Sequence, residues 1–208
     1  MEALWRVDPA RAALLVIDMQ NDFVRPGHPM HVPMALERLP RMKHVVAECR
    51  AVGMPVIYTE HVLLETFDIS PLETAYNPVL RTTGLRADSF GAHIVDELTP
   101  ESGDVVVRKH RYDAFHNTRL ETVLATVTGH RRIDTVVIIG TLTEVCCDST
   151  ARGAYMRDYQ VAFISDATGG LSEQSQQATE QVIGRFFGRV LATADLVIEI
   201  RDIPTTTT

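Results

Sequence analysis

A carboxylate, a cation and a thiol are each associated with an apolar run in this 208-residue sequence. Asp18 and Lys109 each end such a run, and Cys146 follows a third one, residues 136–139, after a glycine. Runs rich in β-branched residues are typical of strands buried on both faces of a parallel sheet. The carboxyl ends of parallel strands line one edge of the sheet, which is where open α/β sheets bind ligands. We therefore expect the three side chains to lie close together at that edge.

These three residue types together could carry out nucleophilic catalysis. Thr143 can cap a helix whose first turn contains Cys146, and the unpaired N–H groups and dipole of that turn favour a thiolate. Lys109 can stabilise the thiolate by its charge, while Asp18 can accept the thiol proton and later deliver it to a leaving amine. Backbone N–H groups between Gly140 and Cys146 can bind an oxyanion. The sequence thus predicts a cysteine nucleophile that needs no histidine.

Each of these residues also has a simpler interpretation. A lone aspartate or lysine at the end of a strand usually forms an ordinary surface ion pair. Most buried free cysteines are inert and behave as small hydrophobic residues. The informative feature is therefore the coincidence of all three residue types at three predicted strand ends.

Apolar runs alternate with helical patterns along the chain, which indicates an α/β protein whose mostly parallel sheet lies between two layers of helices. We predict a single domain over residues 1–208, with a three-layer α-β-α architecture and six strands. Residues 62–100 are irregular, and a loop of this length in a compact domain is usually functional. The predicted strands span residues 12–18, 55–59, 105–109, 135–140, 160–166 and 190–193. The predicted helices span residues 36–52, 118–127, 144–157 and 172–187, with a turn of helix near residues 89–95.

The composition is that of an acidic globular protein. The net charge of −7 and the pI near 5.6 argue against nucleic acid or an anionic membrane as a partner. No apolar run approaches the roughly 20 residues that a membrane span needs, and the amino-terminal residues lack the layout of a signal peptide. Three cysteines do not make a disulfide framework, so we expect a reducing, cytoplasmic location. Glycine-rich phosphate loops are absent, so we expect no nucleotide and no other cofactor.

Several ordered motifs resemble the isochorismatase-like cysteine hydrolase superfamily over nearly the whole chain. The resemblance implies the Rossmann-like isochorismatase fold and an Asp–Lys–Cys catalytic triad formed by Asp18, Lys109 and Cys146. Cys147 stands where the family has an apolar residue, which leaves Cys146 as the nucleophile. The matching segments are Leu15-Val-Ile-Asp-Met-Gln-Asn-Asp-Phe23, Gly53-Met-Pro-Val-Ile-Tyr58, Lys109-His-Arg-Tyr-Asp-Ala-Phe115 followed by Asn117-Thr118, Gly140-Thr-Leu-Thr-Glu-Val-Cys-Cys-Asp-Ser-Thr-Ala-Arg152 and Ser165-Asp-Ala-Thr168.

The same resemblance implies a cis peptide bond between Thr141 and Leu142. That bond would turn the Leu142 N–H inward, where it would join the Cys146 N–H in an oxyanion hole. A disulfide between Cys146 and Cys147 would abolish the nucleophile, so we expect both to be free thiols.

Four residues are candidates for substrate contact. Phe23, His61 and Tyr112 would supply an aromatic wall and polar groups beside the triad, and Thr141 is the fourth candidate. A plain packing role explains each of the first three about as well as a binding role does.

The presence of Cys146 points to hydrolysis of a C–N bond in an amide or ureide, because the family members that hydrolyse the isochorismate vinyl ether lack the cysteine. Among the cysteine enzymes, the chain looks most like ureidoacrylate and N-carbamoylsarcosine amidohydrolases. We therefore expect an amidohydrolase of small linear amides that releases ammonia through a thioester. The alternatives are an isochorismatase-type ether or ester hydrolase, a nicotinamidase, and a small-molecule-binding or redox-sensing domain that uses Cys146 and Cys147 as a thiol pair.

Nicotinamidases of this family carry an Asp-x-His motif and a nearby second histidine that bind a metal after the second strand. Here Glu60 and His61 stand in that region, and neighbouring strand residues point to opposite faces. His28 and His31 lie in the preceding loop, where histidines are more often solvated. We therefore expect no metal. The resemblance also implies a homodimer or a homotetramer.

Overall fold

A six-stranded sheet forms the centre of the computed structural model, which describes residues 4–64, 69–129 and 132–202. The strand order is β3-β2-β1-β4-β5-β6, and every neighbouring pair is parallel. The predicted α/β class is confirmed. The prediction was a mostly parallel sheet, and all of its strand pairs are parallel. The strands are β1 (Ala12–Ile17), β2 (Val56–His61), β3 (Val105–Lys109), β4 (Thr135–Thr141), β5 (Gln160–Gly169) and β6 (Arg189–Leu191).

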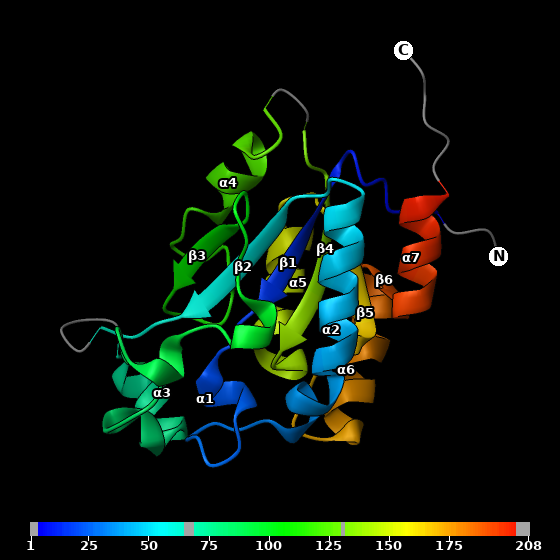
Figure 1. Cartoon of the computed structure of the whole chain (residues 1–208). Helices are drawn as coiled ribbons and strands as arrows, with labels where there is room; N and C mark the ends of the chain where they lie inside the picture. Colours follow the sequence, from blue (N-terminus) through cyan, green and yellow to red (C-terminus); the bar gives the residue numbers. More distant parts are fainter. Residues whose placement is uncertain (1–3, 65–68, 130–131, 203–208) are drawn as a thin grey trace.

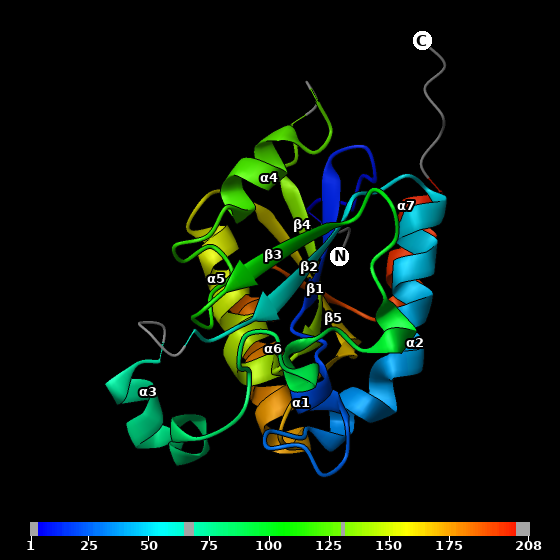
Figure 2. The same cartoon turned by 60° about the vertical axis from the view of Figure 1, so that its left-hand side comes forward.

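Helices cover both faces of this sheet, as the three-layer prediction requires (Figures 1 and 2). One face packs against α2 and α7, and the other packs against α4, α5 and α6. No helix in the described ranges is long and apolar enough to cross a membrane. The bounds are α2 (Pro33–Ala51), α4 (Leu120–Thr126), α5 (Asp148–Tyr155), α6 (Glu173–Phe186) and α7 (Thr193–Arg201).

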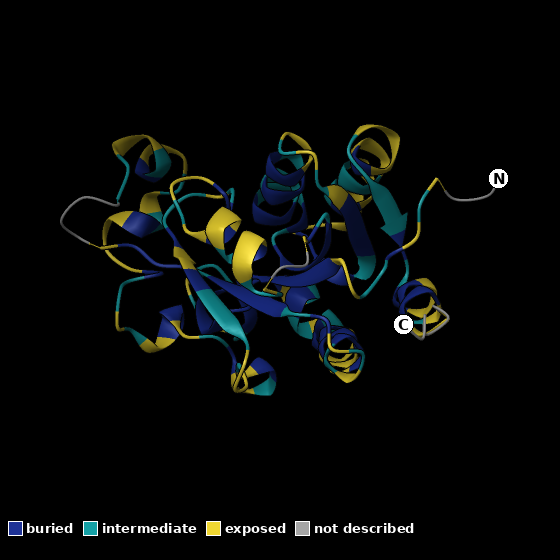
Figure 3. Ribbon diagram, turned by 90° about the horizontal axis from the view of Figure 1, so that it is seen from above, coloured by how far each residue is buried: buried dark blue, intermediate teal, exposed yellow. Residues whose placement is uncertain are grey.

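The central strands are continuously apolar because both of their faces are buried. Along β1, Leu14 and Val16 face the core beneath α2 and α7, whereas Leu15 and Ile17 face the core beneath α4, α5 and α6. All residues of β1 and β4 are buried, and Figure 3 shows the buried strands between helices whose outer faces are exposed. A fully apolar run is therefore the expected sequence for these two strands.

The order of the strands reverses between β1 and β4, which are neighbours in the middle of the sheet. Ligands of open α/β sheets bind at such a switch point, outside the carboxyl ends of the strands. Gly140 lets the two strand ends approach closely, because a Cβ atom at this position would lie 2.1 Å from the carbonyl oxygen of Ile17. Its φ of 117° also lies in the region that favours glycine. The sheet thus brings the segments that follow β1 and β4 together.

Short helices that were not predicted lie at this carboxyl edge (Figure 1). α1 (Asn21–Val24) interrupts a segment predicted as loop, and α3 (Pro71–Tyr76) lies inside the irregular region 62–100. α3 begins with Ser70, whose side chain accepts a hydrogen bond from the backbone N–H of Glu73, and continues with Pro71 in its first turn. The remaining described part of this region contains three 3₁₀ turns, Pro78–Arg81, Phe90–Ala92 and Asp96–Leu98.

Candidate active site

Asp18 and Lys109 form a fully buried ion pair at the ends of β1 and β3. Their Oδ2 and Nζ atoms are 2.6 Å apart, and both side chains have 0% of their surface exposed. The Thr59 hydroxyl donates to Asp18 Oδ1 over 2.6 Å, and Lys109 Nζ donates to the carbonyl of Arg111 over 3.0 Å. Burial opposes the charge on Lys109, but Asp18 and Cys146 outweigh it and raise the lysine pKa. The cation is therefore fixed beside the carboxylate.

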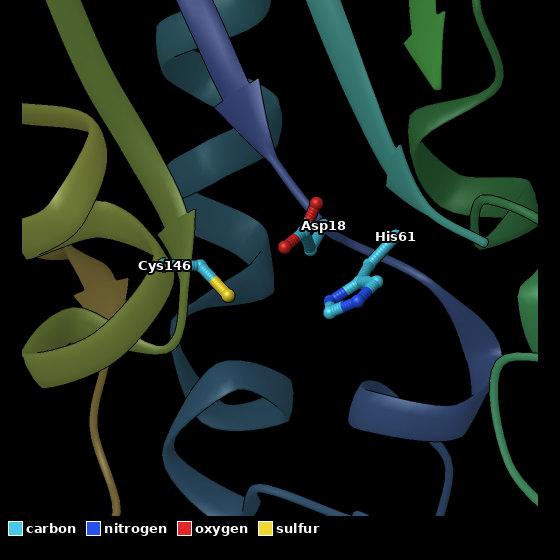
Figure 4. A group of neighbouring side chains, drawn as sticks. All are labelled: Asp18, His61 and Cys146. Carbon is cyan, nitrogen blue, oxygen red and sulfur yellow. The ribbon is translucent and has the colours of Figure 1, made fainter. Parts of the chain in front are cut away.

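Cys146 brings its sulfur to this pair from the turn after β4. Figure 4 shows the side chains of Asp18, His61 and Cys146 directed toward one space, and their potential ligand atoms all lie within 4.8 Å of one another. The sulfur acts electrostatically on both members of the pair, since Lys109 lowers the cysteine pKa, Asp18 raises it, and Cys146 raises the pKa of Lys109. The structure thus brings together the three side chains that the sequence pattern placed at strand ends.

The resting form of Cys146 is a thiol. Burial raises its pKa, Lys109 lowers it and Asp18 raises it again, with the result that the pKa lies at about 12. Lys109 and the backbone of Leu142 do lower this pKa, as the sequence pattern suggests, but burial and the Asp18 charge outweigh them. For this sulfur to act as a nucleophile it would need a base, and the Asp18 carboxylate lies within 4.8 Å of it.

Alkylation of Cys146 by iodoacetamide should follow this raised pKa. We expect the rate to increase about tenfold for each pH unit between pH 7 and 9, because only the thiolate reacts and its fraction grows tenfold per unit below the pKa. The rate is measured by mass spectrometry of the Cys146 peptide, with the Cys146→Ala protein as the control for other thiols. A plateau below pH 9 would contradict the assignment of a resting thiol.

The turn that carries Cys146 contains a cis peptide bond between Thr141 and Leu142, as the resemblance implied. The following residues form η4 (Thr143–Cys147), a π-helical turn, before α5 begins. π-helical turns are rare and occur frequently at functional sites. The backbone N–H of Leu142 acts on the Cys146 sulfur and lowers the cysteine pKa, which favours the thiolate. A backbone donor is therefore present where the reacting atoms would meet.

Thr143 does not cap this helix, which corrects the sequence-based expectation. Its hydroxyl instead donates to Oε1 of Gln176 in α6 over 2.6 Å, and the preceding Leu142 occupies the cap position without a side-chain hydrogen bond. The helix predicted to begin at residue 118 begins instead at Leu120. Arg119 precedes the first residue of α4, and the Thr118 hydroxyl accepts from the N–H of Leu120.

Cys146 opens onto a cavity of about 330 Å³. Three of the four candidate contact residues, Phe23, His61 and Tyr112, line it together with Cys146. The Thr141 side chain is not part of this lining, because Thr141 is fully buried and its hydroxyl donates to the carbonyl of Gly169 over 3.0 Å. The other lining residues are Pro29, Met30, His31, Glu73, Asn77, Leu80, Leu85, Leu142, Val145 and Leu171.

His61 is a buried, neutral imidazole beside the thiol. Burial and then the positive charges of Lys109 and Arg111 lower its pKa well below the usual range. Gln20 fixes its backbone, accepting from the N–H over 2.8 Å and donating to the carbonyl over 3.0 Å. The ring packs edge-on against Tyr112, and Nε2 has no hydrogen-bond partner among the described residues. This nitrogen is available to a bound substrate.

The two strand residues considered as metal ligands, Glu60 and His61, do not point to the same place in the structure. Glu60 accepts a hydrogen bond from Arg108 over 3.3 Å, whereas His61 faces the cavity. A metal could instead find a carboxylate, an imidazole and a thiol on Asp18, His61 and Cys146, which are donor types that zinc accepts. The Lys109 ammonium already contacts the Asp18 carboxylate, so a cation would meet both a competitor and a repulsive charge. The expected absence of a metal stays a prediction.

Two of the titratable residues that line the cavity, His31 and Glu73, were not expected from the sequence to lie there. His31 lies in a loop, where a histidine is expected to be solvated, but it lines the cavity, and no periodic pattern points to it. Glu73 comes from α3, and here a signal existed. Residues 70–73 read Ser-Pro-Leu-Glu, which has the form of a helix start with a capping residue, a proline and an acid three positions later.

Comparison with known proteins gives consistent relationships. The family model described as "Isochorismatase domain" matches residues 12–195. Ureidoacrylate amidohydrolase RutB of Methylobacterium radiotolerans is 32% identical over 203 residues, which cover 88% of this chain and 77% of that protein. The crystal structure of a cysteine hydrolase from Pseudomonas syringae pv. phaseolicola superposes with a TM-score of 0.87 at 29% identity, covering 97% of this chain and 99% of the other. N-carbamoylsarcosine amidase from Thermoplasma acidophilum superposes with a TM-score of 0.75 at 27% identity, covering 88% and 96%.

Proposed function

Because the chain belongs to the isochorismatase family of hydrolases, we propose that it cleaves the C–N bond of a small amide or ureide, of the ureidoacrylate or carbamoyl type, with Cys146 as the nucleophile. The observation that carries the proposal is the buried Asp18–Lys109 pair beside the Cys146 thiol at the wall of a cavity. The names of the amidohydrolase and amidase relatives support the same reaction class. The substrate class is part of what we propose.

The first half-reaction forms a thioester. Asp18 takes the proton of the Cys146 thiol as the sulfur attacks the carbonyl carbon, and Lys109 stabilises the negative charge that develops on sulfur. The N–H groups of Leu142 and Cys146 hold the oxyanion of the tetrahedral intermediate. When the C–N bond breaks, protonated Asp18 gives its proton to the leaving nitrogen. Ammonia departs, and the acyl group remains on sulfur.

The second half-reaction restores the enzyme. Asp18, again ionised, takes a proton from water while the water oxygen attacks the thioester carbonyl. The same backbone donors hold the second oxyanion. The C–S bond then breaks, the carboxylic acid leaves, and Asp18 returns its proton to the Cys146 sulfur. One amide and one water are consumed, and one acid and one ammonia are released.

A screen for ammonia release tests this function. It covers ureides, N-carbamoyl amino acids, maleamate-like amides and nicotinamide, and we expect turnover in one of the linear classes. Rapid turnover of nicotinamide alone would instead favour the nicotinamidase alternative and reopen the question of a metal. Release of no ammonia, together with vinyl ether cleavage that survives Cys146→Ala, would replace the proposal with the ether hydrolase alternative.

We also propose that the chain forms a homodimer or a homotetramer. Exposed apolar side chains on α5, α6 and the turn after α5 support this, since Tyr155, Met156 and Phe186 border one surface depression. Contiguous exposed apolar surface of this kind often marks a protein–protein contact.

A further inference from the structure

The cavity that contains Cys146 also contains a carboxylate that the reaction does not use. Glu73, in the first turn of α3, lines the same cavity as the thiol. Its Oε2 atom is buried and has no hydrogen-bond partner among the described residues. Burial raises the pKa of Glu73, while Arg111 and Lys109 oppose that change. A buried carboxylate oxygen without a donor is costly, so a ligand that supplies one would gain stabilisation here.

Glu73 is separated from the thiol by a chain of contacts. Tyr112 lines the same cavity as Glu73 and acts on the pKa of its carboxyl, and the Tyr112 ring packs against His61. His61 in turn lies beside Cys146. The carboxylate is thus placed to meet the end of a substrate that does not react, while Cys146 meets the reacting carbonyl.

The charge of the cavity favours one kind of substrate end. Among the described residues that line it, none is an arginine or a lysine, and Glu73 is the sole carboxylate. Two cations outside this lining, Lys109 and Arg111, act on Glu73. Lys109 is already paired with Asp18, and burial lowers the pKa of His61 well below its usual range. A substrate carboxylate would therefore face the like charge of Glu73 in a partly water-excluded site, where the two charges repel each other. The other polar lining groups are His31, His61, Asn77 and Tyr112.

Building on the proposed amide hydrolysis, we propose that Glu73 selects substrates whose non-reacting end carries N–H donors, an uncharged amide or an ammonium group, and rejects substrates that end in a carboxylate. Glu73 Oε2 accepts the hydrogen bond of that end, and the apolar side chains of Phe23 and Leu85 cover the carbon chain between the two ends. The reacting group stays an amide or ureide as proposed above, but ureidoacrylate carries a carboxylate at its other end, so this inference narrows the substrates to those amides and ureides that lack one.

Three probes of similar length test the proposal: succinamide, succinamate and 4-aminobutanamide. We expect kcat/KM from ammonia release to be at least about tenfold higher for succinamide and 4-aminobutanamide than for succinamate. Glu73→Gln removes the charge of the side chain. The kcat/KM values for succinamide and 4-aminobutanamide should then lie within about threefold of the value for succinamate. The largest decrease in kcat/KM should be that for 4-aminobutanamide. Glu37→Gln makes the same charge change on the exposed surface of α2 and should leave all three ratios unaltered.

Calorimetric binding of the same probes to the Cys146→Ala protein separates this proposal from the proposed reaction. Tighter binding of the donor-ended probes without any ammonia release by the unaltered enzyme would uphold the role of Glu73 and overturn the reaction. Equal or tighter binding of succinamate would overturn the role of Glu73, whatever the turnover. If Glu73→Gln unfolds, Tyr112→Phe, which removes the hydroxyl beside the carboxylate, should still shift the ratio between the neutral and anionic probes. An unchanged ratio in both variants would also overturn it.

Discussion

Replacing Cys146 with alanine is expected to lower kcat for amide hydrolysis by a factor on the order of 10⁴–10⁶, as loss of a catalytic nucleophile typically does. Cys147→Ala should keep kcat within about tenfold of the unaltered value. The difference follows from position, because Cys146 lines the cavity whereas Cys147 is fully buried in the core beneath α5. Burial also raises the pKa of the Cys147 thiol well above its usual range. Ammonia release at saturating substrate measures the effect.

The two alanine variants serve as controls for each other. Both remove a buried sulfur from neighbouring positions, so a general packing effect would reduce both activities together. Comparable activity in the two variants would contradict the assignment of Cys146. If the chain were instead a redox-sensing domain, the two thiols would oxidise together and neither variant would affect any amide turnover.

Lys109→Met is expected to reduce the free energy of unfolding by about 3–5 kcal/mol, because it leaves the buried Asp18 carboxylate without its counter-charge. Amide hydrolysis should fall with it. The pKa of Lys109 is raised in the folded state, so the lysine's stabilising contribution is complete below its unfolded pKa of about 10.4 and is lost as the pH rises through the folded value. The stability difference should therefore be constant from pH 7 to 9 and shrink only at higher pH. Urea unfolding across this range measures it.

A double variant separates the charge effect from the catalytic effect. Asp18→Asn combined with Lys109→Met removes both buried charges, so it should recover part of the lost stability but none of the activity. A Lys109→Met protein as stable as the unaltered chain would show that the ion pair is solvated. It would then contradict the proposal that Lys109 holds Asp18 in place for proton transfer.

Much of the fold could be predicted from the sequence because both faces of the central strands are buried. Such burial requires uninterrupted apolar runs. The point at which the apolar run stops therefore locates the carboxyl ends of β1 and β4 in the sequence. The convergence of Asp18, Lys109 and Cys146 then follows from a parallel sheet, in which all carboxyl ends share an edge. The backbone conformation at the end of β4 was harder to predict. The cis peptide bond was expected only from the family resemblance, and the π-helical turn was not predicted.

The cavity was harder to predict, because its walls come from loops and short helices rather than from periodic elements. Glu73 lies on a six-residue helix, too short for an apolar repeat to reveal. His31 has no repeat around it at all. Thr141 shows the opposite error, since a residue beside the nucleophile turn in sequence directs its hydroxyl to the backbone of Gly169 instead of the cavity. Position in the sequence located the reacting atoms but not the surface that selects a substrate.

Mass spectrometry of the intact protein, quenched with acid during turnover, tests the central claim most directly. A thioester on Cys146 predicts an added mass equal to that of the substrate minus ammonia, located on the peptide that contains Cys146 and absent from Cys146→Ala. Steady hydrolysis of an amide with no added mass at any quench time, or with the added mass on the Cys147 sulfur, would contradict it.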